Sequence, residues 1–120
     1  MRYLITGGAG FVASYLTEHL LGEGHQVTLF DRRRASRPTK AAVVQGDVRN
    51  AELVAAVVAR HDAVFHLAGI VGFANVLTRT RETILTATHG TANVLAAAAT
   101  EKKRVLLSST SAQRDRKSVV

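Results

Sequence analysis

The chain has 120 residues, of which 47% are hydrophobic and 21% are charged, and it contains no cysteine. This composition is typical of one soluble globular domain, and it excludes disulfides and metal sites built from thiolates. No apolar run approaches the ~20 residues that span a bilayer, and the apolar stretch at the N-terminus is too short for a signal peptide. We therefore expect a cytoplasmic protein that does not associate with membranes.

The net charge of +7 comes from 16 basic and nine acidic side chains. The basic residues lie in separate groups, the largest within 32–40, and the four Phe and two Tyr do not alternate with them. Proteins that bind single-stranded nucleic acid usually place aromatic side chains along a basic groove, where bases stack on them. We therefore expect the cations to face solvent or a phosphate group, and we expect no nucleic-acid partner.

The first elements follow directly from the apolar pattern. Residues 3–5 predict a short buried strand that ends at a glycine-rich segment. Val12, Leu16 and Leu20 then recur every four residues, which predicts a helix with one apolar stripe that stops near 22–24.

The next two strands are predicted at 26–30 and 41–45, on either side of the basic segment. The second of them closes at Gly46 and Asp47. A helix follows, with apolar positions at a helical period: Leu53, Val54, Val57 and Val58.

Residues 63–66 predict a fourth strand, followed by a loop at 69–75, and residues 105–107 predict a fifth strand. A long helix is expected between these strands. Its apolar stripe is predicted to contain Ile84, Leu85, Thr88, Thr91, Leu95 and Ala98.

Strands that alternate with helices indicate an α/β fold, specifically an open, doubly wound parallel sheet of the Rossmann type. In such a sheet, ligands bind in the crevice outside the carboxyl ends of the strands. Several candidate residues follow predicted strand ends, although they are far apart in the chain: the segment 7–10, Asp31, Asp47, the pair 68–69 and Thr110.

The segment from Gly7 to Ala13 joins the first strand to the first helix, as a phosphate-binding loop does. Gly7 would permit the tight turn, and Gly10 would let a diphosphate approach the backbone. The backbone N–H groups of Phe11 and Val12 would then donate hydrogen bonds to that diphosphate at the helix N-terminus. The alternative is an ordinary glycine-rich turn.

Asp31 lies 21 residues after Gly10, about where an acidic residue receives the adenosine ribose hydroxyls. A carboxylate there repels a 2′-phosphate, which favours NAD over NADP. Arg32 and Arg33 leave the choice open, because either cation can pair with that phosphate or cover the adenine. The alternative for Asp31 is a helix or turn cap.

Six motifs follow one another along the chain: Thr6 to Ala13, Asp31, Gly46 to Val48, His66 to Gly69, Gly90 to Leu95 and Ser108 to Thr110. In this order they resemble the extended short-chain dehydrogenase/reductases, and specifically the NAD-dependent epimerase/dehydratase group. The resemblance covers about residues 1–112. It implies that Asp47 and Val48 contact the adenine, and that Leu67, Ala68 and Gly69 line the path from the diphosphate to the nicotinamide ribose.

The resemblance also implies that Thr110 is the Ser/Thr member of a Ser/Thr–Tyr–Lys catalytic set, with a strand-end cap as the alternative. Neither Tyr3 nor Tyr15 has Lys four residues later, so the Tyr-x-x-x-Lys pair is absent. We therefore expect an inactive cofactor-binding half of a homodimeric NAD-dependent oxidoreductase that acts on a small molecule, a nucleotide sugar or a related hydroxy compound. The alternative is a non-catalytic dinucleotide-binding regulatory module.

We expect residues 1–112 to form an incomplete Rossmann domain, truncated after its fifth strand, and residues 113–120 to be an unstructured tail. Residues 115–120 match one reading frame of a common sequencing-adapter sequence that then meets a stop codon, so this tail is interpreted as non-native. Four histidines have no spacing typical of a metal site: His19, His25, His61 and His89. His66, at the end of a buried strand, is expected to pack rather than to act as an acid or base.

Overall fold

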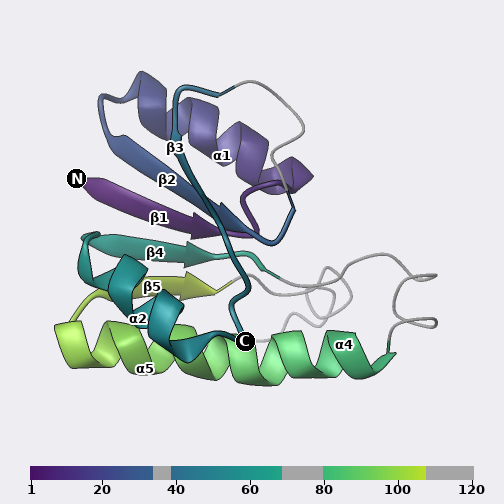
Figure 1. Ribbon diagram of the computed structural model, residues 1–120. Coiled ribbons are helices and arrows are strands. Elements are labelled where there is room, and N and C mark those ends of the chain that lie inside the picture. Colours follow the sequence, from purple (N-terminus) through teal and green to yellow (C-terminus); the bar gives the residue numbers. More distant parts are fainter. Residues whose placement is uncertain (34–38, 69–79, 108–120) are drawn as a thin grey trace, which may run out of the picture.

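The computed structural model describes residues 1–33, 39–68 and 80–107 (Figure 1). They form a five-stranded, fully parallel sheet in the order β3-β2-β1-β4-β5. The strands are β1 (Arg2–Thr6), β2 (Gln26–Asp31), β3 (Ala42–Gln45), β4 (Ala63–His66) and β5 (Arg104–Leu107). Each predicted strand agrees with the observed one to within one residue at either end.

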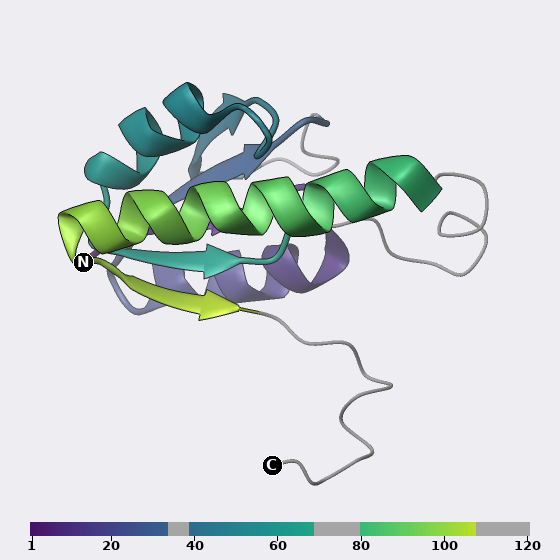
Figure 2. The same ribbon diagram turned by 90° about the horizontal axis from the view of Figure 1, so that it is seen from below.

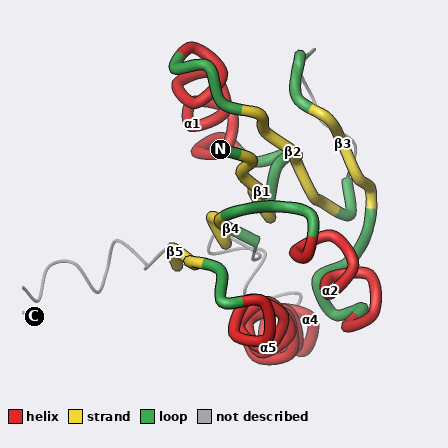
Figure 3. The backbone as a smooth tube through the Cα atoms, turned by 90° about the vertical axis from the view of Figure 1, so that its left-hand side faces the viewer, coloured by secondary structure: helices red, strands yellow, loops and turns green. Residues whose placement is uncertain are grey.

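The helices cover both faces of the sheet, which confirms the doubly wound fold. They are α1 (Phe11–Gly22), α2 (Ala51–Ala59), α4 (Thr80–Leu85), the π-helical turn η1 (Thr86–Gly90) and α5 (Thr91–Glu101). Helix α1 lies on one face, whereas α2 and α5 lie on the other (Figures 1 and 3). No helix in the described ranges is long and apolar enough to cross a membrane.

The core has two parts, one on each face, because successive side chains of a strand point to opposite faces. In β1, Leu4 belongs to the cluster beneath α2 and α5, and its neighbour Ile5 belongs to the cluster beneath α1. In β2, Phe30 belongs to the cluster beneath α2 and α5, and Leu29 belongs to the cluster beneath α1. All four side chains are at most 4% exposed, so the sheet is buried on both faces in its centre.

The predicted stripe of α1 is wrong at its first residue. Val12 is 64% exposed, and the residues that α1 buries are Ala13, Thr17 and Leu20. Helix α1 packs on the sheet through small side chains, which the apolar pattern did not count. The Thr17 hydroxyl is tolerated there because it donates to the Ala13 carbonyl oxygen at 2.6 Å.

The predicted stripe of the long helix is also wrong in part. Ile84 and Leu95 are 54% and 42% exposed, and α5 instead buries Val94, Ala97 and Ala98. Figure 2 shows α4, η1 and α5 as one continuous rod. The π-helical turn within it holds an extra residue, which rotates all later side chains around the axis. A stripe read with one constant period therefore cannot follow the buried face on both sides of η1, although Ala98 of the predicted stripe is buried as expected.

Candidate functional site

The sheet order places β1 between β2 and β4, and the chain reverses its direction of winding at that point. The carboxyl ends of parallel strands beside such a switch point form the ligand crevice of doubly wound folds. The segments that follow β1, β2, β3 and β4 all leave the sheet at the carboxyl ends of these strands, on the same side of the molecule (Figure 1). The described candidate residues are therefore brought to one end of the molecule.

Gly7 makes the first turn after β1 and is required there for two reasons. Its φ of +74° lies in the left-handed region, which residues with a Cβ rarely adopt. A Cβ on Gly7 would also lie 2.7 Å from the Leu67 carbonyl carbon and oxygen, in the segment after β4. The turn thus packs directly against the backbone that leaves β4.

Gly8 is a requirement that the sequence analysis missed. A Cβ at this position would lie 2.6 Å from the Leu29 Cβ, so the turn also packs closely against β2. The N–H groups of Gly7 and Gly8 both donate to the Phe30 carbonyl oxygen, at 2.8 and 3.2 Å. The signal that was available is the glycine pair itself, because a single glycine is sufficient for the turn.

Gly10 is the N-cap of α1 and supplies no capping side chain. No acidic residue lies in the first turn of α1, whereas α2 begins with the Asn50 side chain as its cap and with Glu52. A Cβ on Gly10 would meet only the Gly7 carbonyl oxygen, at 3.2 Å. The N-terminus of α1 thus has partial positive charge, exposed donors and no anionic side chain of its own.

Asp31 ends β2, and its carboxylate is bound to the glycine-rich turn. One oxygen accepts from the Ala9 N–H at 2.9 Å, and the other accepts from the Arg33 N–H at 2.9 Å. The Arg33 guanidinium lies 3.6 Å from the same carboxylate, which is 13% exposed. Gln45 holds the adjacent backbone by donating to the Arg32 carbonyl oxygen at 3.0 Å.

Asp47 and Val48 follow β3 and are held by residues that the sequence analysis did not single out. The Arg49 guanidinium donates to both oxygens of Asp47, and its shortest contact is 2.8 Å, from Nη2 to Oδ2. This hydrogen bonding lowers the pKa of the Asp47 carboxyl group. The Val48 side chain is buried, and its carbonyl oxygen accepts from Asn93 Nδ2 at 2.9 Å. The contact with Asn93 spans 45 residues, and no local pattern marks it.

His66 is buried at the end of β4 and joins three elements. Its Nδ1 lies 2.7 Å from the Thr6 hydroxyl, and its Nε2 lies 3.1 Å from the Thr91 hydroxyl. Thr6 Oγ1 also accepts from the N–H groups of Leu67 and Ala68, at 3.0 and 3.2 Å. These two hydrogen bonds occupy both lone pairs of Thr6 Oγ1, so the Thr6 hydroxyl must donate its proton to His66 Nδ1. The ring proton of His66 therefore lies on Nε2.

Burial lowers the pKa of His66, which fits a neutral ring that packs and positions the backbone. Because Thr6 is the last residue of β1, the ring also ties the segment after β4 to the start of the glycine-rich turn. This arrangement agrees with the packing role expected of His66.

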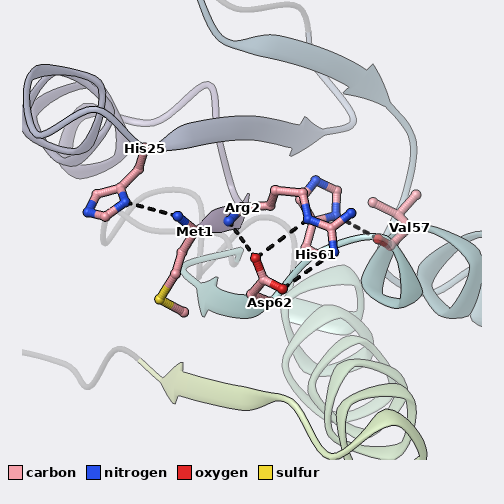
Figure 4. Close-up of polar contacts among 6 residues, drawn as sticks. All are labelled: Met1, Arg2, His25, Val57, His61 and Asp62. Carbon is pink, nitrogen blue, oxygen red and sulfur yellow. Dashed lines mark hydrogen bonds and ion pairs between the residues drawn. The ribbon is translucent and has the colours of Figure 1, made fainter.

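The opposite end of the sheet carries a separate polar group (Figure 4). Asp62 accepts from the backbone and the guanidinium of Arg2, the backbone N–H at 2.7 Å, and this contact lowers the pKa of Asp62. His61 Nδ1 donates to the Val57 carbonyl oxygen at 2.7 Å. No group of three or more His, Asp or Glu side chains within the described ranges is arranged to hold a metal ion.

Two predicted site residues, Gly69 and Thr110, lie outside the described residues, as do the predicted loop at 69–75 and the tail at 113–120. Gly7, Gly10, Phe11, Val12, Asp31, Arg32, Asp47, Val48, Leu67 and Ala68 lie at or just beyond the carboxyl ends of β1 to β4.

Fold and site together define a doubly wound domain with the loop arrangement of a dinucleotide-binding protein. The sequence matches the profile of the NAD dependent epimerase/dehydratase family over residues 3–118. The chain therefore belongs to this family, and the expected resemblance is confirmed. The expectation of NAD as cofactor is confirmed at the level of the family.

Three similar proteins illustrate the match. The chain is 38% identical over 92% of its length to UDP-N-acetyl-alpha-D-glucosaminuronate decarboxylase of Bacillus cytotoxicus. It is 43% identical over 68% of its length to 3-beta-hydroxysteroid dehydrogenase of Mycolicibacterium neoaurum. A crystal structure of UDP-glucose-4-epimerase from Stenotrophomonas maltophila, with bound NAD and formylated UDP-arabinopyranose, superposes on 93% of the chain with a TM-score of 0.83 and 25% identity.

The chain matches only part of each of these proteins. It spans 36% of the decarboxylase, 23% of the steroid dehydrogenase and 38% of the epimerase chain. The relatives therefore share this region while their names record different substrates.

Proposed function

We propose that this chain is the NAD-binding half of an NAD-dependent oxidoreductase of its family. The observation that carries the proposal is the hydrogen bond from the Ala9 N–H to the Asp31 carboxylate, which connects the glycine-rich turn to the end of β2. It sets an anion-binding helix N-terminus beside a carboxylate suited to ribose hydroxyls. An ordinary glycine-rich turn needs neither feature.

The residues around the turn fit a diphosphate. Gly10 leaves space above the backbone, and the first-turn N–H groups of Phe11 and Val12 would donate to the phosphate oxygens. The lack of an acidic residue in this turn avoids repulsion of the anion.

NAD is favoured over NADP because of the Asp31 carboxylate, which the Ala9 N–H prevents from turning aside. A 2′-phosphate at the ribose would lie against this negative charge. Arg33 is already engaged with Asp31, and Arg32 is proposed to cover the adenine.

The remaining cofactor contacts come from the loops after β3 and β4. Asp47 and Val48 would contact the adenine, and Leu67, Ala68 and Gly69 would line the path to the nicotinamide ribose, as the family resemblance implies. When bound, NAD supplies the hydride acceptor or donor of the reaction. Thr110 is proposed as the hydroxyl that binds the reacting substrate oxygen.

The substrate is proposed to be a nucleotide sugar, because the decarboxylase and the epimerase carry UDP-sugar names or ligands. A related hydroxy compound is the second candidate, favoured by the steroid dehydrogenase match. We propose that the chain alone is inactive, because it has no Tyr-x-x-x-Lys pair. We further propose that the whole protein is cytoplasmic and homodimeric and has no nucleic-acid partner.

Isothermal titration of the chain with NAD and with NADP, followed by addition of UDP-sugars, tests the proposal. The expected result is saturable binding that is tighter for NAD, with no turnover of any sugar. Absence of binding would overturn the assignment as a cofactor-binding half. Turnover of a UDP-sugar would overturn the proposed inactivity. Tight cofactor binding by a chain that supports no catalysis when it replaces the same region of a complete family enzyme would favour the regulatory module.

A further inference from the structure

The start of α5 contacts both loops of the candidate cofactor crevice without lying in either of them. Three residues make the contacts, and we call Gly90, Thr91 and Asn93 the α5 brace. Gly90 is the last residue of the π-helical turn η1, and Thr91 and Asn93 lie in the first turn of α5. Such turns are rare inside helices and frequently occur at functional sites.

The first contact of the brace is with the loop after β3. Asn93 Nδ2 donates to the Val48 carbonyl oxygen at 2.9 Å. A Cβ on Gly90 would lie 2.5 Å from Val48 Cγ2, although the φ of Gly90 is an ordinary −64°. Gly90 is therefore needed for close approach rather than for backbone conformation. Helix α5 and the loop are in direct contact, with a hydrogen bond beside the contact.

The second contact is with the segment after β4. Thr91 Oγ1 lies 3.1 Å from His66 Nε2, which carries the proton and therefore donates to it. His66 Nδ1 accepts from Thr6, whose hydroxyl oxygen accepts from the N–H groups of Leu67 and Ala68. Thr91 thus fixes the ring that fixes Thr6 and, through it, the backbone after β4.

We propose that the α5 brace sets the distance between the adenine loop at 46–49 and the segment at 67–68, so that it determines cofactor affinity through positioning alone. The two contacts come from one turn at the start of helix α5, and they reach segments that are 18 residues or more apart in the chain. The effect on ligand affinity rests on the proposed function. The effect on the two loops does not, because the contacts belong to the protein itself.

Two nearly isosteric substitutions each remove one contact of the α5 brace. Asn93→Asp removes the donor to Val48, and Thr91→Val removes the acceptor for His66. Thr91→Ser restores that hydroxyl. Thr100→Val is the matched control, because the Thr100 hydroxyl is exposed on the same helix and donates only to the Ala96 carbonyl oxygen among the described contacts.

Titration with AMP measures affinity at the adenine half of the crevice, and titration with NAD measures affinity across both halves. Asn93→Asp is expected to weaken AMP and NAD by a similar factor, about threefold to tenfold. Thr91→Val is expected to weaken NAD by such a factor while AMP binding stays unchanged. Thr91→Ser and Thr100→Val are expected to bind both ligands like the unmodified chain. A general loss of stability would weaken both ligands in both variants, and that result would overturn the proposal.

Amide hydrogen exchange without ligand tests the brace independently. Exchange is expected to accelerate at 46–49 in Asn93→Asp and at 67–68 in Thr91→Val, with the centre of β1 unchanged. Imidazole nitrogen shifts are expected to report the Nε2–H form of His66. Unchanged exchange at both segments would overturn the brace. If these changes occur and the unmodified chain binds neither AMP nor NAD, the proposed function fails and the brace stands.

Discussion

The carboxylate of Asp31 accepts a hydrogen bond from the backbone N–H of Ala9 at 2.9 Å, which joins the end of β2 to the turn after β1. The two residues are 22 positions apart, and they meet because β1 and β2 are adjacent parallel strands. A second bond, from the Arg33 N–H, holds the other carboxylate oxygen. The side chain that we propose to face the adenosine ribose is thus oriented by the same turn that is proposed to bind the diphosphate.

The first prediction concerns cofactor choice. Asp31→Asn keeps an oxygen that can accept from Ala9 and removes the negative charge. We expect the ratio of NADP to NAD affinity to rise about tenfold or more, because removing the charge of a side chain that is only 13% exposed relieves a repulsion of about 1.4 kcal/mol or more. Parallel titrations of both cofactors measure the ratio. An unchanged ratio would show that Arg32 or Arg33, and not Asp31, determines the preference.

The second prediction concerns the glycine-rich turn. Gly7→Ala should lower the free energy of unfolding by about 3 kcal/mol or more, because it combines a left-handed backbone with a Cβ too close to Leu67. Gly24→Ala is the matched control. Its φ is +88°, but nothing lies within 4 Å of its Cβ, so we expect a cost of about 1 kcal/mol. Urea denaturation measures both, and equal costs would mean that the turn does not pack against the segment after β4.

The third prediction concerns pH. Burial lowers the pKa of both His61 and His66 below the ordinary value of 6.5. Between the lowered and the ordinary pKa, the unfolded chain binds protons that the folded chain does not, so stability falls as the pH drops below 6.5. We expect the urea midpoint to be clearly lower at pH 5.5 than at pH 7.5.

His66→Gln provides the control for this pH effect, because glutamine keeps a polar side chain that does not titrate. Its stability should change less between the two pH values than that of the unmodified chain, although its stability at pH 7.5 is lower. A pH dependence as steep as before the substitution would show that His66 does not contribute to it.

The fourth prediction concerns self-association. Strand β5 pairs only with β4 within the described part of the sheet, and Leu106 on it is 57% exposed. Open strand edges with apolar side chains promote association, which lysine on the edge opposes. Leu106→Lys should therefore reduce the oligomeric fraction in size-exclusion chromatography with light scattering. Ala55→Lys, which adds the same charge on the exposed side of α2, should leave that fraction unchanged.

Most of the fold could be predicted from the sequence because the signals are local. Apolar strands such as 63–66 and the strand-to-helix glycine turn are visible in a short window, and the order of elements then determines the topology. The helix faces were harder. Ala13 and Thr17 are buried although they are small or polar, and the π-helical turn before Thr91 shifts the phase of α5.

The positions of the site residues could be predicted from the sequence, but the contacts that hold those residues in place could not. Gly7 and Asp31 stand at strand ends that a reader can find in the sequence. Contacts such as that of Asn93 with Val48 or of His66 with Thr6 join residues 45 and 60 positions apart. Such pairs depend on how helices and strands pack in three dimensions, and a single sequence carries no direct signal of them.

The most direct test of NAD binding at the glycine-rich turn compares NAD titrations of the unmodified chain and of Gly10→Val. Gly10 has extended backbone angles that valine adopts easily, and its Cβ would displace only the Gly7 carbonyl oxygen, by a few tenths of an ångström. The fold should therefore persist, which circular dichroism can verify, while the side chain fills the space proposed for the diphosphate. The account predicts saturable NAD binding by the unmodified chain and none by the folded variant. Equal affinity of the two proteins for NAD would contradict it.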